Sequence, residues 1–299
     1  EPGSGKTAIA LALASAFASQ PGGVLWLTVD NSPLTELLVR VGRAYNVEAV
    51  MNSDQPIAMI GAVASTLTQH KPLIVLDGQP DERGTAQFLS KCASGLPVLI
   101  TSSRGDADGP WVNYELQALD GDAAMMLFKQ KSGITGSDTD DAVAAITELL
   151  GNLPFPIVIA ARAMAASKQQ PEAYLVTLQQ VAEAAGGDEM MTALTASYRA
   201  LNNALQGLML MLGATYRGQA SGKMLSMISG VPEDSINQAM TVLSQLYLVE
   251  KFNQYEQPYY RLHHSAHLFA NTWLRGSNRL ETMQERVRDA VLSYLNTYG

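Results

Sequence analysis

The five residues Gly3-Ser4-Gly5-Lys6-Thr7 restrict the fold of this chain more than any other part of its sequence. They match the end of the pattern G-x-x-x-x-G-K-[ST], a glycine-rich loop that leads into a helix. Glycines allow backbone N–H groups to turn inward, and the start of the following helix adds partial positive charge. The pattern predicts a phosphate-binding loop, whereas a chance glycine turn before a helix is the alternative. The residues expected to contact a nucleotide here are Pro2, Gly3, Ser4, Gly5, Lys6, Thr7 and Ala8.

The side chains of this loop have separate expected roles. Lys6 is expected to reach the β- and γ-phosphates, and the Thr7 hydroxyl is expected to ligate Mg²⁺. Such a loop normally follows a central parallel strand, and a parallel sheet that lacks a middle strand exposes an unpaired ladder. We therefore expect at least one strand of this domain to lie upstream of Glu1.

Residues 1–120 alternate between helical and strand patterns. Short apolar runs rich in β-branched residues predict strands, and apolar residues spaced three or four apart predict helices. This alternation, with short connections, is typical of a parallel α/β sheet. The predicted strands are 24–29, 72–76, 97–101 and 114–119, and the predicted helices are 7–19, 34–45, 57–70 and 86–93.

Asp77 follows the buried strand Leu73-Ile74-Val75-Leu76. A carboxylate at the carboxyl end of a parallel strand beside the loop is placed to hold Mg²⁺ through water, so Thr7 and Asp77 are the predicted metal residues. The alternative is an aspartate that only caps a strand or turn. Asp81 and Glu82 follow, and either could polarise an attacking water, although a solvated turn is an equal alternative. The predicted catalytic residues are Asp77, Asp81 and Glu82.

The pattern changes after Asp120, where the sequence becomes helical. Residues 121–189 are predicted to form a helical domain, 190–275 a winged-helix domain, and 276–299 the start of a C-terminal helical segment. The winged helix is predicted from the order helix, helix, helix, hairpin. The predicted helices are 121–132, 139–150, 156–167, 172–185, 192–212, 222–229, 232–246 and 280–298, and the predicted hairpin strands are 248–252 and 259–262.

Charge and cysteine content limit the partners and the compartment. A formal net charge of −8 argues against broad electrostatic capture of nucleic acid or of an anionic membrane. Cys92 is the single cysteine, which suits a reducing, cytoplasmic setting. His263, His264 and His267 cluster after the predicted hairpin, but the cysteine count and the lack of a carboxylate at ligand spacing disfavour zinc. A packed or nucleotide-facing histidine is the better interpretation.

Five segments in order resemble the signal-transducing STAND class of P-loop NTPases and, within it, the NB-ARC family. Residues 1–7 look like the Walker A loop, and residues 73–77 look like the Walker B strand. Residues 99–104 are similar to the sensor strand of the family, which ends in an arginine, here Arg104. Gly151-Asn152-Leu153-Pro154-Phe155-Pro156-Ile157 looks like the GLPLAL segment, and Tyr260-Arg261-Leu262-His263-His264-Ser265 is similar to the MHD segment.

The chain departs from the family pattern at three places. Asn152 stands where GLPLAL has a glycine, and His264 stands where MHD has an aspartate. Asp77-Gly78 followed by Asp81-Glu82 is closer to the neighbouring NACHT pattern, with one extra residue between. These departures leave the subfamily and the capacity to hydrolyse ATP open.

The resemblance implies an ATP/ADP-binding molecular switch, with Mg²⁺ and at most slow ATPase activity. It implies that Lys6, Thr7, Pro154 and His263 contact ADP and hold the module closed, and that Arg104 touches the γ-phosphate. Exchange for ATP would free the winged helix and permit self-association. Effector and sensor domains would lie outside this chain.

Two other functions remain as alternatives. An AAA+-type motor ATPase also combines a P-loop domain with a winged helix, and Arg162 could serve as its helical-domain sensor arginine; continuous turnover would distinguish it from a switch. A DNA-binding transcriptional regulator would use the winged helix directly. The predicted recognition helix, 232–248, contains Glu233 and Asp234 and neither Lys nor Arg, so we expect no direct nucleic-acid binding.

Overall fold

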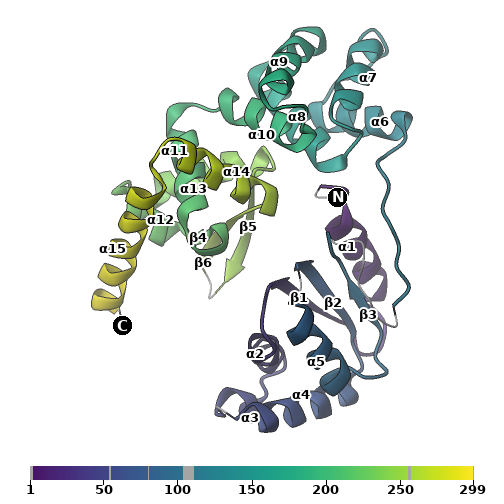
Figure 1. Ribbon diagram of the computed structural model, residues 1–299, viewed down its shortest axis with the longest axis vertical. Helices are drawn as coiled ribbons and strands as arrows, with labels where there is room; N and C mark the ends of the chain where they lie inside the picture. The colour runs from purple at the N-terminus through teal and green to yellow at the C-terminus, as the bar shows by residue number, and fades with distance from the viewer. Residues whose placement is uncertain (1–2, 54, 80, 104–110, 255–256, 299) are drawn as a thin grey trace. The chain divides into compact units, whose positions relative to one another are not determined.

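A computed structural model of the chain describes residues 3–53, 55–79, 81–103, 111–254 and 257–298 (Figure 1). The predicted nucleotide contacts Pro2 and Arg104 lie outside these residues. The chain divides into two compact units, Glu1–Leu116 and Gln117–Gly299. No helix in the described ranges combines the length and the apolar character that crossing a membrane requires.

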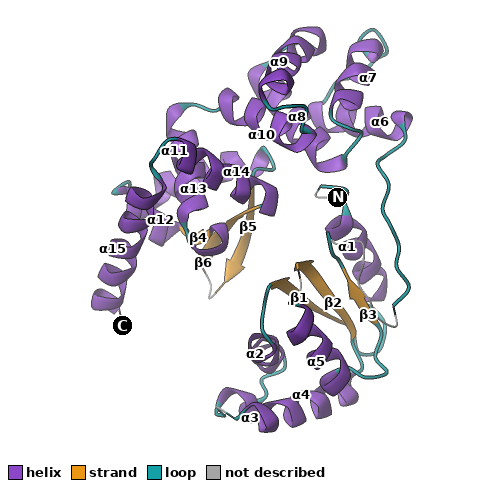
Figure 2. Ribbon diagram, in the orientation of Figure 1, coloured by secondary structure: helices purple, strands orange, loops and turns teal. Residues whose placement is uncertain are grey.

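The first unit contains a three-stranded parallel sheet in the order β1-β2-β3 (Figure 2). The parallel sheet predicted from the sequence is therefore present. Helices connect each strand to the next, as parallel βαβ topology requires. The strands are β1 (Val24–Asp30), β2 (Leu73–Gln79) and β3 (Val98–Ile100). The helices are α1 (Lys6–Phe17), α2 (Leu34–Ala44), α3 (Glu48–Met51), α4 (Pro56–His70) and α5 (Glu82–Cys92).

Alternation along β2 divides the core of this unit into two faces. Leu73 and Val75 pack with α1, whereas Ile74 and Leu76 pack with residues of α2, α4 and α5. Successive side chains of a strand point to opposite faces, so Asp77 continues the α1 side of the sheet. The position of Asp77 beside the start of α1 thus follows from the period of the strand.

The strand predicted for residues 114–119 is wrong. Residues 111–120 form neither helix nor strand. Val112 is 97% exposed and Tyr114 is 86% exposed, so the apolar alternation in this segment is not matched by burial. A strand is stabilised only beside a second strand, and here the backbone N–H of Leu119 instead donates to the carbonyl of Asn152 at 3.1 Å.

The second unit contains ten helices and a small antiparallel sheet in the described ranges (Figure 1). A 3₁₀ turn, Tyr216–Gly218, precedes the first strand. The sheet has the order β4-β6-β5, with strands β4 (Gln219–Ser221), β5 (Val249–Gln254) and β6 (Gln257–Leu262). The helices are α6 (Gly121–Ser132), α7 (Asp140–Leu149), α8 (Pro154–Ser167), α9 (Pro171–Ala184), α10 (Glu189–Ala200), α11 (Asn203–Ala214), α12 (Gly222–Ser229), α13 (Glu233–Gln245), α14 (His264–Gly276) and α15 (Leu280–Tyr298).

The single helix predicted for residues 192–212 is wrong, because α10 and α11 are separate. The chain is extended at Leu201 and Asn202, and the Asn202 side chain accepts a hydrogen bond from the backbone N–H of Leu205 at 2.9 Å. Asparagine is a favoured N-cap because its side chain satisfies a donor that has no partner within the helix. The apolar pattern continues across the break, which concealed it in the sequence. Helix α14 and strand β4 were also not predicted.

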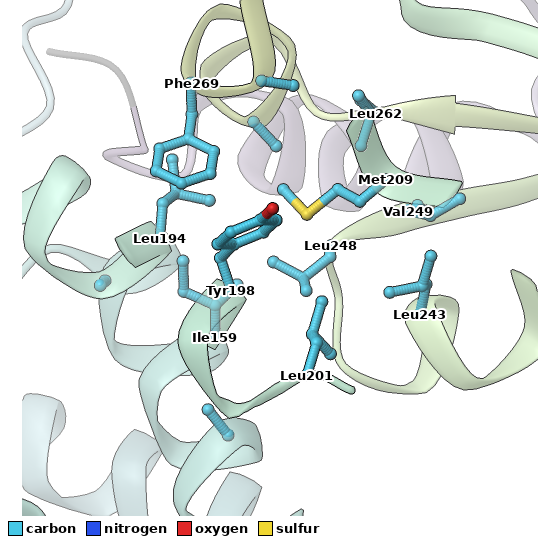
Figure 3. Packing of buried hydrophobic residues seen from close by; sticks show 14 of the residues in the cluster. Ile159, Leu194, Tyr198, Leu201, Met209, Leu243, Leu248, Val249, Leu262 and Phe269 are labelled. Carbon is cyan, nitrogen blue, oxygen red and sulfur yellow. The ribbon is translucent and has the colours of Figure 1, made fainter. Parts of the chain in front are cut away.

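One hydrophobic core runs through the second unit from α6 to α15. In this core the ring of Tyr198 on α10 lies beside that of Phe269 on α14 (Figure 3), and Trp273 of α14 also contacts Tyr198. The ring centroids of Tyr198 and Phe269 are 5.6 Å apart, and those of Tyr198 and Trp273 are 4.8 Å apart. The helices before residue 189 therefore share a core with the elements after it, while the predicted domain boundaries at 189 and 275 stay predictions.

Candidate functional site

The glycine loop, residues 3–7, has a backbone that only glycines adopt easily. Gly3 has φ 81° and Gly5 has φ 93°, both in the left-handed region. Helix α1 begins directly at Lys6, so the positive end of its dipole lies in the loop. Lys6 Nζ donates to Ser4 Oγ at 3.2 Å, and Ser4 is buried. The loop thus combines a helix N-terminus and a lysine ammonium group.

Asp77 joins this loop to the sheet. Its Oδ1 accepts a hydrogen bond from Thr7 Oγ1 at 2.9 Å and a second one from Thr101 Oγ1 at 2.8 Å. Asp77 is only 8% exposed, so the hydrogen bonds replace the solvation that its carboxylate has lost. Thr7 and Asp77 are predicted from the sequence to share one site, and the structure brings them together.

Thr101 belongs to the same site, although it is not among the site residues predicted from the sequence. It follows β3, the strand next to β2, and its hydroxyl also accepts from the backbone N–H of Gly78 at 2.9 Å. Leu99 packs on the α1 side of the sheet, so Thr101, two residues later, continues that side. The carboxyl ends of neighbouring parallel strands meet at one edge of a sheet, and this rule was the signal that could have identified Thr101.

Gly78 fixes the backbone beside Asp77. Its φ of 124° is unfavourable for residues with a side chain, and a Cβ atom here would lie 2.1 Å from the carbonyl oxygen of Val29. Any larger residue would therefore force β1 and β2 apart. The close approach of these strands holds the Asp77 carboxylate in place.

Asp81 has a structural role at the start of α5. Its Oδ2 accepts a hydrogen bond from the backbone N–H of Gly84 at 2.6 Å, which makes it the N-cap of the helix. This cap starts α5 at Glu82, four residues before the predicted start of the helix. Glu82 is exposed in the first turn. The catalytic roles of Asp81 and Glu82 stay predictions.

In the second unit, Pro154 and His263 lie at the starts of two helices that meet. Pro154 is the first residue of α8, and the ring of the next residue, Phe155, stacks on His263 with centroids 4.0 Å apart. His263 caps α14, because its Nδ1 accepts from the backbone N–H of Ser265 at 3.3 Å. With Nδ1 as an acceptor, the neutral imidazole carries its proton on Nε2 and can donate it to an oxygen atom. The Phe155 contact was not anticipated.

The backbone conformation of Asn152 explains one departure from the GLPLAL pattern. Asn152 has φ 52° and the preceding Gly151 has φ 62°, so both lie in the left-handed region. Asparagine enters this region more readily than most residues with a side chain. Asn152 can therefore replace glycine here without a change of backbone.

Comparisons with known proteins give only a loose likeness. No family model and no curated protein matches the chain. A solved structure of the Aeropyrum pernix ORC2 protein in ADPNP–ADP complexes is 14% identical, with a TM-score of 0.41, and the match covers 98% of this chain and 86% of that one. The ADP form of the same protein is 15% identical, with a TM-score of 0.39 and coverage of 96% and 85%. TM-scores this low assign no residue a role.

Proposed function

We propose that the chain binds ATP or ADP with Mg²⁺ through the glycine loop. The observation that carries this proposal is the hydrogen bond between Thr7 and Asp77, which joins two separate sequence motifs across 70 residues. A chance glycine turn has no reason to be bonded to a buried carboxylate at the end of a neighbouring strand. This arrangement favours phosphate binding over the turn interpretation.

The side chains present fit a magnesium nucleotide. A threonine hydroxyl has one proton and two lone pairs. Because Thr7 donates its proton to Asp77, its lone pairs stay available to a cation, and Mg²⁺ prefers oxygen ligands of this kind. Bound Mg²⁺ would supply positive charge that neutralises the phosphate oxygens. Thr7 would ligate it, Asp77 would orient Thr7, and Lys6 would contact the phosphates.

Retained nucleotide tests this proposal directly. The protein is purified, denatured, and the released nucleotide is identified by chromatography. A near-stoichiometric ADP or ATP peak is expected, and Lys6→Ala should remove it. Lys91→Ala is the matched control, because Lys91 is an exposed lysine in the last turn of α5 in the same unit. If no nucleotide is retained and calorimetry detects no binding of MgATP or MgADP, the proposal is wrong.

We further propose that the bound nucleotide operates a switch of the STAND type, in which the later elements form a winged helix and His263 contacts ADP. The stacking of Phe155 on His263 supports this reading, since it brings the two segments predicted to contact the nucleotide together in one place. Helix α13 followed by β5 and β6 fits a winged helix. Self-association on ATP binding and an ADP-locked closed state are parts of the same proposal.

The AAA+-type ATPase is the second candidate. The order of a P-loop unit, helices and an antiparallel hairpin is common to both classes, so the fold alone does not separate them. Turnover separates them, because a motor hydrolyses ATP continuously whereas a switch retains its product. A burst of one ADP per chain followed by slow exchange supports the switch. Steady turnover that is insensitive to His263→Ala supports the AAA+ reading.

The role of His263 is tested by the release rate of ADP. His263→Ala should speed release, because it removes the Nε2 donor and the ring that stacks on Phe155. His264→Ala is the matched control, since His264 is the adjacent, exposed first residue of α14. Equal release rates in both variants would exclude a contact between His263 and the nucleotide.

A further inference from the structure

A hollow of about 300 Å³ lies on the second unit where α8, α13 and β5 meet. Its lining is polar and cationic, which is unusual in a chain whose formal net charge is −8. Two cations and four residues with hydroxyl, phenol or amide groups face it. The lining residues are Arg162, Thr241, Ser244, Gln245, Tyr247 and Lys251.

A third cation, Lys131, contacts Tyr247, which is one of the residues that line the hollow. Lys131, in the last turn of α6, lies with its Nζ 5.2 Å from the centroid of the Tyr247 ring and donates to the phenol oxygen at 3.4 Å. The guanidinium carbon of Arg162 lies 5.4 Å from the same centroid. The pKa of Tyr247 is lowered below its usual value, mainly by the hydrogen bond from Lys131 and next by that from Arg162. This shift is expected where positive charges lie close to a phenol group.

These three residues, Lys131, Arg162 and Lys251, form the cation cluster. Among the described residues, none of the three has a carboxylate within ion-pair distance. By contrast, Lys129, which lies two residues before Lys131, forms an ion pair with Asp140. The positive charge of the cluster therefore has no carboxylate partner among the described residues, and an anion in the hollow would supply one.

The backbone at Tyr247 shows that the ring is held in place at a conformational cost. Tyr247 has φ 60°, and it follows α13 at the position where a glycine is usual. The turn is closed by hydrogen bonds from Leu248 N–H to the Leu243 carbonyl at 3.1 Å and from Tyr247 N–H to the Ser244 carbonyl at 3.0 Å. A bulky side chain is disfavoured in this conformation. Here it places a phenol group between Lys131 and Arg162.

We propose that this hollow binds a phosphate group carried by a small molecule, such as a phosphomonoester or a diphosphate. Several cations around one point suit an anion with two or more charges, and a guanidinium group matches two phosphate oxygens at once. The Ser244 hydroxyl can donate to a remaining oxygen, whereas the Thr241 hydroxyl already donates to the Asn237 carbonyl at 2.7 Å. The site consists of residues of the second unit alone, and the proposal does not depend on nucleotide binding by the glycine loop.

Nucleic acid fits this site less well. A duplex contacts a broad basic surface, whereas this hollow holds one small group. Helix α13, which lines the hollow, carries Glu233 and Asp234 in its first turn and no cation. These charges oppose a phosphate backbone that continues along the helix. The observations therefore favour a small phosphorylated ligand.

Calorimetry with inorganic pyrophosphate tests the proposal. The full chain carrying Lys6→Ala is titrated, so that the glycine loop does not account for the heat. Binding is expected, and Arg162→Gln and Lys131→Gln, each added to the Lys6→Ala chain, should each weaken it by about tenfold or more, because each removes a charged donor. The matched control is Lys223→Gln, which removes a lysine lying 5.6 Å from the ring centroid of Tyr294 elsewhere in the unit.

Each outcome decides the proposal. Loss of affinity in the two cluster variants, with Lys223→Gln unchanged, supports it. Absence of binding to the Lys6→Ala chain overturns it, and so does an equal loss in all three lysine and arginine variants, which would indicate only net charge. A short DNA duplex that binds more tightly than pyrophosphate and is lost in the same variants would overturn the small-ligand assignment. Because Lys131 and Arg162 lie on different helices, misfolding of one variant leaves the other as the test.

Discussion

The two units differ in how the hydroxyl groups of selected threonines are bonded. In the first unit, Thr7 and Thr101 bond to Asp77 across 70 and 24 residues of sequence. In the second unit, Thr147 and Thr192 donate to carbonyl oxygens of their own helical turns, three or four residues away. A bond within a helical turn forms whenever the helix forms. A bond between strand ends requires the whole unit to be assembled, so the polar site of the first unit depends on its tertiary structure.

The source of stability differs in the same way. The second unit has one apolar core that runs through its helices without interruption. The first unit has two smaller clusters, one on each face of the sheet, and the cluster under α1 is the smaller of the two. We therefore expect apolar truncation to have its largest effect in the second unit, and loss of a hydroxyl to have its largest effect in the first.

The largest effect is expected from truncation in the core of the second unit. Phe128 on α6 is fully buried, and Phe128→Ala should lower the free energy of unfolding by about 3–5 kcal/mol, because it removes a large apolar side chain and leaves a cavity. Urea denaturation followed by circular dichroism measures this. Met126→Ala on the same helix is the control, since Met126 is 71% exposed and its truncation should change stability by less than about 0.5 kcal/mol. Similar losses in both variants would contradict the assigned core.

The second prediction tests the contrast between hydroxyl groups. Thr101→Val should destabilise the first unit by about 1–3 kcal/mol, since it leaves a buried carboxylate oxygen and the Gly78 N–H with fewer partners. It should also weaken binding of MgATP, because Asp77 loses a positioning contact. Thr192→Val is the matched change in the second unit, where the lost bond is to the Asp188 carbonyl of the same helix. Its cost should be clearly smaller, and equal costs would remove the distinction between the two units.

The sequence predicted the first unit well because its pattern is local. Strand and helix periods placed most elements within a few residues, and the loop motif identified residues 3–7 without reference to the fold. Thr7 and Asp77 were paired because both motifs are contiguous runs. Thr101 has no motif of its own, and its role follows only from register and alternation in the assembled sheet.

Prediction was weaker where a single residue overrides a continuous pattern. Asn202 divides α10 from α11 inside an uninterrupted apolar run, and Asp81 starts α5 early. The segment 114–119 has strand-like composition but no partner strand. The cation cluster could not be predicted from the sequence for another reason. Its members, Lys131, Arg162 and Lys251, lie far apart in sequence and come together only through packing around Tyr247.

The third prediction concerns an exception within the second unit. The Tyr260 hydroxyl donates to Asn237 Oδ1 at 3.0 Å, joining β6 to α13 across 23 residues. Tyr260 is fully buried, so Tyr260→Phe should cost about 1 kcal/mol in the free energy of unfolding. Thermal and urea denaturation measure the loss, and nucleotide affinity should stay unchanged. A larger loss than that of Thr101→Val would mean that long-range hydroxyl bonds matter as much in the second unit as in the first.

The smallest effect at neutral pH is expected at Cys92, in the larger of the two apolar clusters of the first unit. Burial raises the pKa of its thiol to about 11, and the side chain is 4% exposed. Since the unfolded thiol has a lower pKa, near 9, the unfolded state loses its proton first, and stability should fall as pH rises from about 9 to 11. Below pH 8 the thiol is protonated in both states, so this loss of stability is absent.

Alkylation by iodoacetamide measures this shift. The rate for the folded chain should stay far below that of the urea-denatured chain at pH 8, because the thiolate is the nucleophile and burial suppresses it. The ratio between the two rates measures how strongly the folded structure protects the Cys92 thiol. Fast alkylation of the folded chain at pH 8 would show that the packing around Cys92 opens readily, and it would contradict the protection expected from burial.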